Sequence, residues 1–493
     1  MELYENDNLF ENDQQYLLSD SYQIVGSKTP RRYWIGLIVI LLSNISLSIV
    51  SVAIWPYLHI NGLTISILAI ALASFHSGSS IGRKFFSYYI EKTKSYWLLL
   101  VTSLVVTFIG DVVYASYPHI SSIVISRFIV GFGTGSQVVL QNLLSDSTDS
   151  ILLKYRVSKI TLFTSIAYVL GPALVAALST IDIPYHLSTS TQVERYNYFN
   201  GITLIGWIAA FLTLISIGLA LLGKLLDNSI TKHYETTNTD ESLVRNNNNI
   251  INNNNTTTFP YKSQKSCIFP PKVTIFIFCF SHFLIFNAGM ILEMIFIPYI
   301  IDLGGMSSYN WSLTKISLFF MGLGISCMIA STVSKKIQNQ EYLLMGSILL
   351  VIVGYCLMIL WNLPTFSVAS NHQSPQIFRF LLGVVFVAIG FPIAVSSSIK
   401  MFFDLFASIH PAYSNVVFQF STNLGRLTGP IWTALIVSNI GPNNVFFFGF
   451  IISLTSLILL LTLKKSTKYI SSVTNIQRNV PIISDDDTDN YKF

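Results

Sequence analysis

The chain has 493 residues, of which 52% are hydrophobic and only 11% are charged. Soluble globular domains carry about 25% charged residues, so this composition excludes one and indicates a membrane protein. The formal net charge of +5 needs no nucleic-acid partner, because the basic residues gather in polar breaks between apolar segments. The 4 cysteines lack metal-ligand spacing, so we expect neither a metal site nor a disulfide framework.

Twelve apolar segments have about the 20 residues that a helix needs to cross a bilayer. They lie at 34–58, 63–81, 96–115, 120–139, 160–179, 201–222, 273–301, 313–333, 342–361, 377–397, 412–437 and 445–463. The basic loops alternate along this series, so the positive-inside rule predicts that both termini are cytosolic. We therefore expect an all-α, multi-pass protein with the lipid bilayer as its first partner.

The polar segment 224–271 divides the chain into two six-helix halves, at 34–223 and 272–464. Two runs of asparagine make it unable to bury a core, so we interpret it as a disordered cytosolic linker. Residues 1–33 and 465–493 are predicted to be cytosolic tails.

The N-terminal tail contains short patterns that clathrin adaptors bind in proteins of endosomes and lysosomes. Asp13 precedes Leu17 and Leu18 at the spacing of an acidic dileucine signal, and Tyr22 begins a tyrosine-based one. We expect these residues to direct the protein to a lysosomal or endosomal membrane. Asn310 begins a sequon on the opposite side of the membrane, which makes it a candidate glycosylation site.

An arginine and three alternate glycines lie in the fourth apolar segment: Arg127, Gly131, Gly133 and Gly135. A charged side chain at membrane depth costs a few kcal/mol or more, so it is kept where it contacts protein or a water-filled cavity. Glycines four residues apart let a neighbouring backbone approach closely. This segment is thus predicted to line a polar cavity.

Glycine–proline pairs occupy the same relative place in the two halves, counted in segments. Gly171 and Pro172 lie in the fifth segment, and Gly429 and Pro430 lie in the eleventh. Two halves with interrupted helices at matching places are typical of carriers that work by alternating access, with a site near the midplane.

These features together make the chain resemble the major facilitator superfamily, over all twelve segments. More narrowly, it is similar to the lysosomal branch linked to a neuronal ceroid lipofuscinosis. The blocks that carry this likeness are 53–58, Glu293 to Pro298 with Asp302, 334–337, Gly390 to Pro392, and Arg426 to Pro430. The resemblance implies a carrier fold and makes Asp302 a further coupling candidate. The superfamily's usual loop after the second segment is reduced here to 87–94, so its gating role does not transfer directly.

The ionisable residues deepest in apolar segments are Asp111, Arg127, Glu293 and Arg426. Asp111 and Arg127 lie at similar depth on consecutive helices, so they form either a structural ion pair or part of a proton-coupling site. Glu293 is our first candidate for the coupling carboxylate, the alternative being a polar cap. The two arginines suit an anionic solute or chloride.

We therefore expect a carrier that moves a small solute with protons or another ion. The alternatives are a chloride-conducting channel of the same fold and a membrane scaffold that transports nothing. Gly78 to Gly82 matches the hydrolase pattern Gly-x-Ser-x-Gly, but in a membrane helix this spacing indicates packing. We expect neither an enzyme nor a cofactor.

Overall fold

A computed structural model describes residues 31–60, 62–93, 95–116, 119–145, 150–179, 201–241, 271–303, 311–334, 337, 339–359, 377–406 and 411–478. Within these ranges the chain is helical and contains no strand. The helices form two compact units.

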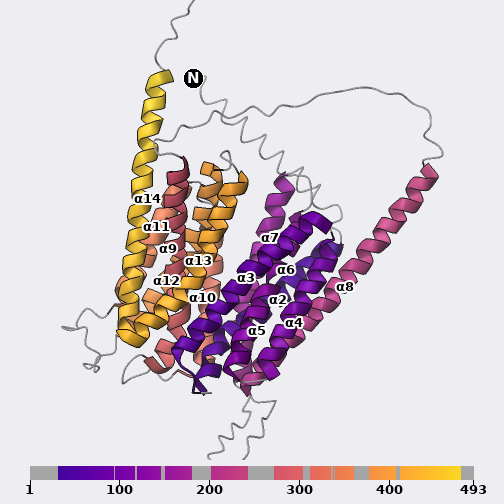
Figure 1. Cartoon of the computed structure of the whole chain (residues 1–493), viewed down its shortest axis with the longest axis horizontal. Coiled ribbons are helices and arrows are strands. Elements are labelled where there is room, and N and C mark those ends of the chain that lie inside the picture. The colour runs from indigo at the N-terminus through magenta and orange to yellow at the C-terminus, as the bar shows by residue number, and fades with distance from the viewer. Residues whose placement is uncertain are drawn as a thin grey trace, which may run out of the picture. The chain divides into compact units, whose positions relative to one another are not determined.

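The first unit is formed by seven helices and the part of α10 that ends at Met328. The helices are α2 (Arg31–Ile60), α3 (Ile65–Thr93), α4 (Tyr96–Ser116), α5 (Ile120–Gly133), α6 (Gly135–Ser145), α7 (Ser150–Ser179) and α8 (Gly201–Glu241), coloured from indigo to magenta in Figure 1. In this unit α3 packs on α5, α4 packs on α5 and α8, and α2 packs on α7 and α8.

The second unit contains the C-terminal helices. They are α9 (Pro271–Pro298), the π-helix η1 (Tyr299–Leu303), the rest of α10 (Leu313–Ser334), α11 (Gln340–Met358), α12 (Ile377–Phe406), α13 (Pro411–Asn439) and α14 (Asn443–Arg478). Here α9 packs against α12, α13 and α14, and α11 packs against α12 and α14.

Each of the twelve predicted segments contains a helix in the described residues, because a chain in lipid must satisfy its backbone hydrogen bonds internally. In the described part of the chain, eleven helices are long and apolar enough to cross a membrane. The predicted span that is missing from the eleven is α13. It carries Arg426 together with hydroxyl and amide side chains such as Gln419, Thr422 and Asn423, which lower its mean hydropathy.

One boundary prediction is wrong. The disordered linker was expected to begin at residue 224, but α8 continues as helix to Glu241. Extending an existing helix fixes one residue per hydrogen bond, whereas starting one fixes several, so a spanning helix readily continues past its apolar part. The asparagine runs lie outside the described residues.

The fourth predicted segment is interrupted at Thr134, where α5 ends and α6 begins. The Thr134 hydroxyl lies 2.8 Å from the Ser79 hydroxyl of α3 and 2.6 Å from the carbonyl oxygen of Gly131. The backbone N–H of Thr134 still bonds to the carbonyl oxygens of Val130 and Gly131, at 3.1 and 3.0 Å. The hydroxyl contact with Ser79 fastens this point to the neighbouring helix.

The seam between α3 and α5 is closest at two glycines of α3, where backbone meets backbone. A Cβ atom on Gly78 or Gly82 would lie 2.2 Å or 2.1 Å from a carbonyl oxygen of α5, at Phe128 and Phe132. Glycine at these positions is thus required by the close approach of two backbones, as small residues permit in membrane helices.

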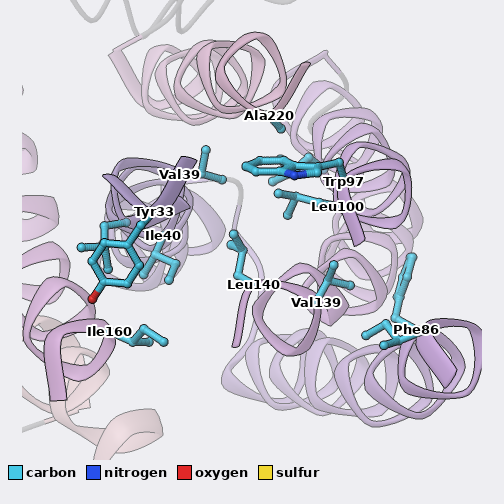
Figure 2. Close-up of a cluster of buried hydrophobic side chains, with 13 residues drawn as sticks. Tyr33, Val39, Ile40, Phe86, Trp97, Leu100, Val139, Leu140, Ile160 and Ala220 are labelled. Atoms are coloured by element: carbon cyan, nitrogen blue, oxygen red, sulfur yellow. The ribbon is translucent and has the colours of Figure 1, made fainter. Parts of the chain in front are cut away.

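Apolar clusters fill each unit. Figure 2 shows the one in the first unit, where the Trp97 indole lies among Val39, Leu100 and Ala220 and Ile160 reaches in from α7. In the second unit the corresponding cluster is built on Phe278, Phe402 and Phe418. The α2 and α4 residues of the first unit's cluster lie near the beginnings of these helices. Polar side chains such as Ser46 and Asp111 lie further along the same helices.

Candidate functional site

Asp111 of α4 is held by hydroxyl groups in the interior of the first unit. It is only 2% exposed. Its Oδ2 atom accepts a hydrogen bond of 2.9 Å from Thr213 of α8 and one of 3.4 Å from Ser46 of α2. Both hydroxyls also contact the carbonyl oxygen of Ala209, at 3.0 Å from Thr213 and 3.2 Å from Ser46. A buried carboxylate with this oxygen-rich surrounding is stabilised by charge-assisted hydrogen bonds.

Arg127 of α5 lies on an aromatic face. Its guanidinium carbon is 4.3 Å from the centre of the Tyr114 ring. The Tyr114 ring in turn lies 5.0 Å from that of Tyr57, centre to centre. Within the described part of the chain, Nε and Nη2 of Arg127 have no hydrogen-bond partner, although the residue is only 5% exposed. The ring face thus stabilises a cation whose hydrogen-bonding capacity is unfilled.

Asp111 and Arg127 are close enough to interact electrostatically. Their direct contacts are nevertheless with different groups: hydroxyls for the carboxylate and an aromatic ring for the guanidinium. The arrangement is therefore two neighbouring charges, each with its own support, rather than the direct ion pair that consecutive helices suggested.

His282 of α9 is the hydrogen-bonded centre of the second unit. Nε2 lies 3.0 Å from the Thr422 hydroxyl of α13, and Nδ1 lies 2.9 Å from the Ser398 hydroxyl of α12. The ring stacks on Phe418 at 4.2 Å between centres. His282 thus ties three helices together and is 1% exposed.

Arg426 and Glu293 form the charged part of the second unit. The guanidinium carbon of Arg426, which is partly buried, lies 4.8 Å from the centre of the Phe286 ring. Its charge acts on both His282 and Glu293. Glu293 is exposed, although its neighbours Leu292 and Met294 are 8% and 0% exposed. Glu293 is therefore an accessible carboxylate between buried neighbours on α9.

The two glycine–proline pairs make equivalent contacts, each inside its own unit. A Cβ atom on Gly171 of α7 would lie 1.7 Å from the hydroxyl oxygen of Ser48 in α2. One on Gly429 of α13 would lie 2.6 Å from Cβ of Met290 in α9. In each unit, the helix that carries the pair thus packs closely on the first long helix of that unit. Pro172 and Pro430 are buried within these helices.

The other predicted packing glycines also lie in close contacts. A Cβ atom on Gly131 would lie 2.1 Å from the carbonyl oxygen of Phe75, one on Gly133 would lie 2.1 Å from the Thr107 hydroxyl, and one on Gly135 would lie 2.2 Å from the Phe86 ring. On α12, Gly390 precedes Pro392 by two residues and lies against the backbone of Ser347 in α11.

Several predicted sites fall outside the described residues. These are Asp13, Leu17, Leu18 and Tyr22 in the tail and the sequon residue Asn310. Asp302 belongs to η1, whose backbone the structure describes, but the side chain of Asp302 is not among the described ones.

The residues that complete both sites were missed by sequence reasoning: Ser46, Tyr57, Tyr114, Thr213, Ser398 and Thr422. Their only signal is a hydroxyl or phenol in an apolar segment. Such residues are frequent in membrane helices, where they also bond to their own backbone, as Thr213 does to Ala209.

The amino-acid sequence of the chain is similar to those of known proteins. The family profile described as "Major Facilitator Superfamily" matches residues 36–371. The chain is also similar to "Major facilitator superfamily domain-containing protein 8" of Xenopus laevis, with 22% identity over 350 residues. That match covers 67% of this chain and 64% of the relative's length.

Proposed function

Because the chain belongs to the Major Facilitator Superfamily and is a membrane transporter, we propose that it carries a small solute by alternating access, driven by protons or another ion. We place it in a lysosomal or endosomal membrane, with both termini in the cytosol. This address rests on the predicted sorting patterns of the tail and on the sequence resemblance.

The observation that carries the proposal is the exposure of Glu293 beside the charge of Arg426. A carboxylate on a spanning helix is unfavourable against lipid, so an exposed one belongs at a polar, water-accessible space. Water access lets such a group gain and lose protons, which is what a coupling residue must do. Arg426, on the neighbouring α13, supplies a positive charge that suits an anionic solute or a deprotonated Glu293.

The test uses the full chain in liposomes with an imposed pH gradient. The liposomes are incubated with a mixture of amino acids, sugars and carboxylic acids, and mass spectrometry measures what accumulates relative to protein-free liposomes. We expect at least one solute to accumulate only when the gradient is present. Glu293→Gln keeps the shape but fixes the neutral state, so it should retain solute exchange and lose gradient-driven accumulation.

Glu341→Gln is the matched control, because Glu341 lies in the first turn of α11. It should behave like the unaltered chain. If Glu293→Gln accumulates solute to the wild-type level, Glu293 has no coupling role and is a polar cap. Asp111→Asn is then the next variant to measure.

A chloride-conducting channel is the second candidate, and the unfilled hydrogen-bonding capacity of Arg127 favours it. Recordings in planar bilayers distinguish the two. Unitary currents that scale with chloride indicate a channel, saturable flux indicates a carrier, and the absence of both indicates a scaffold.

A further inference from the structure

Four oxygen atoms that could coordinate a cation lie close together around Asp111. This oxygen cluster brings together Oδ2 of Asp111, the hydroxyls of Ser46 and Thr213, and the carbonyl oxygen of Ala209. These atoms come from α2, α4 and α8. The four residues lie in the interior of the first unit, none of them more than 2% exposed.

The distances within the cluster are those of ligands around one small ion. The contacts among these oxygens are 2.9, 3.0, 3.2, 3.3 and 3.4 Å. An ion of calcium's size lies about 2.4 Å from its oxygen ligands, so neighbouring ligands at right angles lie about 3.4 Å apart. Sodium has this size, and an outward movement of a few tenths of an ångström would admit it.

The cluster holds more acceptor positions than its two hydroxyl protons can fill at one time. The two hydroxyls have one proton each, yet the Ser46 hydroxyl faces two acceptors outside its own helix and the Thr213 hydroxyl faces three acceptors. A cation among the oxygens would use lone pairs of all four, including those that receive no proton.

The charge near the cluster disfavours a divalent ion more strongly than a monovalent one. The cluster holds one carboxylate, and the positive charge of Arg127 acts on the same group. With both charges counted, sodium leaves one excess positive charge and a divalent ion leaves two, and an excess charge in a buried place is costly. Arg127 also weakens the attraction for a single positive charge, so binding should fall in the millimolar range that lets a coupled ion be released.

We propose that Asp111, Thr213, Ser46 and the carbonyl of Ala209 form a sodium site, separate from Glu293 and Arg426. The use of this ion to drive transport rests on the proposed function, whereas its binding does not.

The experiment measures binding by the full chain in lipid nanodiscs. The probe is ²²Na⁺, displaced by unlabelled sodium, together with thermal unfolding in NaCl or in choline chloride at equal concentration. We expect saturable ²²Na⁺ binding and an unfolding midpoint that sodium raises by a few degrees, as for a ligand that binds only the folded state. KCl should give a smaller increase, because potassium is too large for the cluster.

Two variants test the ligands in different ways. Asp111→Asn removes the charge, and Thr213→Val removes one hydroxyl while keeping the shape. Each should abolish the sodium-dependent shift and lower ²²Na⁺ binding at least tenfold, while Thr213→Ser should retain both. Thr433→Val is the matched control, because the fully buried Thr433 of α13 bonds only to its own helix at Gly429.

Absence of ²²Na⁺ binding by the unaltered chain at 100 mM, equal stabilisation by KCl, or unchanged binding by both Asp111→Asn and Thr213→Val would overturn the assignment. Sodium binding without solute flux would keep this site and reject the proposed carrier. Solute flux without sodium binding would do the reverse.

Discussion

Gly131 of α5 lies directly against the backbone of Phe75 in α3, so that a methyl group on Gly131 would stand 2.1 Å from the Phe75 carbonyl oxygen. We predict that Gly131→Ala separates the two helices and lowers stability by about 1–3 kcal/mol, because backbone atoms have no alternative rotamer to adopt. Gly218→Ala is the control, since a Cβ atom there meets nothing within 4 Å. In detergent, the thermal unfolding midpoint should fall clearly for Gly131→Ala and change little for Gly218→Ala.

The ring of Tyr114 should matter more than its hydroxyl. The ring lies under the Arg127 guanidinium, while the hydroxyl is buried and has no hydrogen-bond partner within the described residues. Tyr114→Phe should therefore leave stability unchanged or slightly higher, whereas Tyr114→Leu should lower it by about 1–2 kcal/mol through loss of the cation–π contact. Equal losses in both variants, measured by thermal unfolding, would contradict this account.

His282 and Thr422 should behave as a coupled pair. Thr422→Val leaves Nε2 of the buried imidazole without its 3.0 Å partner, which should cost about 1–3 kcal/mol. The double variant His282→Phe/Thr422→Val removes both polar groups and should cost less than the sum of the single variants. A double-mutant cycle on chemical unfolding measures this coupling; strict additivity would mean that the hydrogen bond contributes nothing.

The predicted topology has a direct test. Epitope tags at either terminus and within 242–270 should all be digested by protease added to the cytosolic face of intact vesicles. A lumenal enzyme marker serves as the control for vesicle integrity. Protection of any one tag would exclude the twelve-span arrangement with cytosolic termini.

The tail signal should determine the compartment. Leu17→Ala combined with Leu18→Ala should move the protein from lysosomes toward the cell surface, as measured by surface biotinylation. Replacement of Leu9, which lies outside the pattern, by alanine is the matched control. An unchanged location of the double variant would assign sorting to another segment, with Tyr22→Ala as the next variant.

The sequence predicted the helices well, because long, mostly apolar segments in a bilayer must satisfy their backbone hydrogen bonds as helices. The start of α4 at Tyr96 and the end of α7 at Ser179 coincide with the predicted boundaries. The break at Thr134 was not predicted, since it depends on a contact with Ser79 in another helix. The end of α8 was misplaced because polar composition lowers burial without preventing a helix from continuing.

The charged candidates were found in sequence because ionisable residues are rare in apolar segments. Their partners were not, since the contact of Asp111 with Thr213 joins residues that are 102 positions apart. Nothing in the local pattern distinguishes Thr213 from Thr433, whose hydroxyl bonds to its own helix. The distinction arises only when α4 and α8 pack together.

The seam between α3 and α5 limits how the first unit can change shape. Packed helices slide past one another when the side chains between them exchange rotamers. Where Gly78, Gly82 and Gly131 bring backbone onto backbone, there are no such side chains to exchange. We therefore expect α3 and α5 to move as one body in any change of shape, with the contact between Thr134 and Ser79 holding the end of this seam.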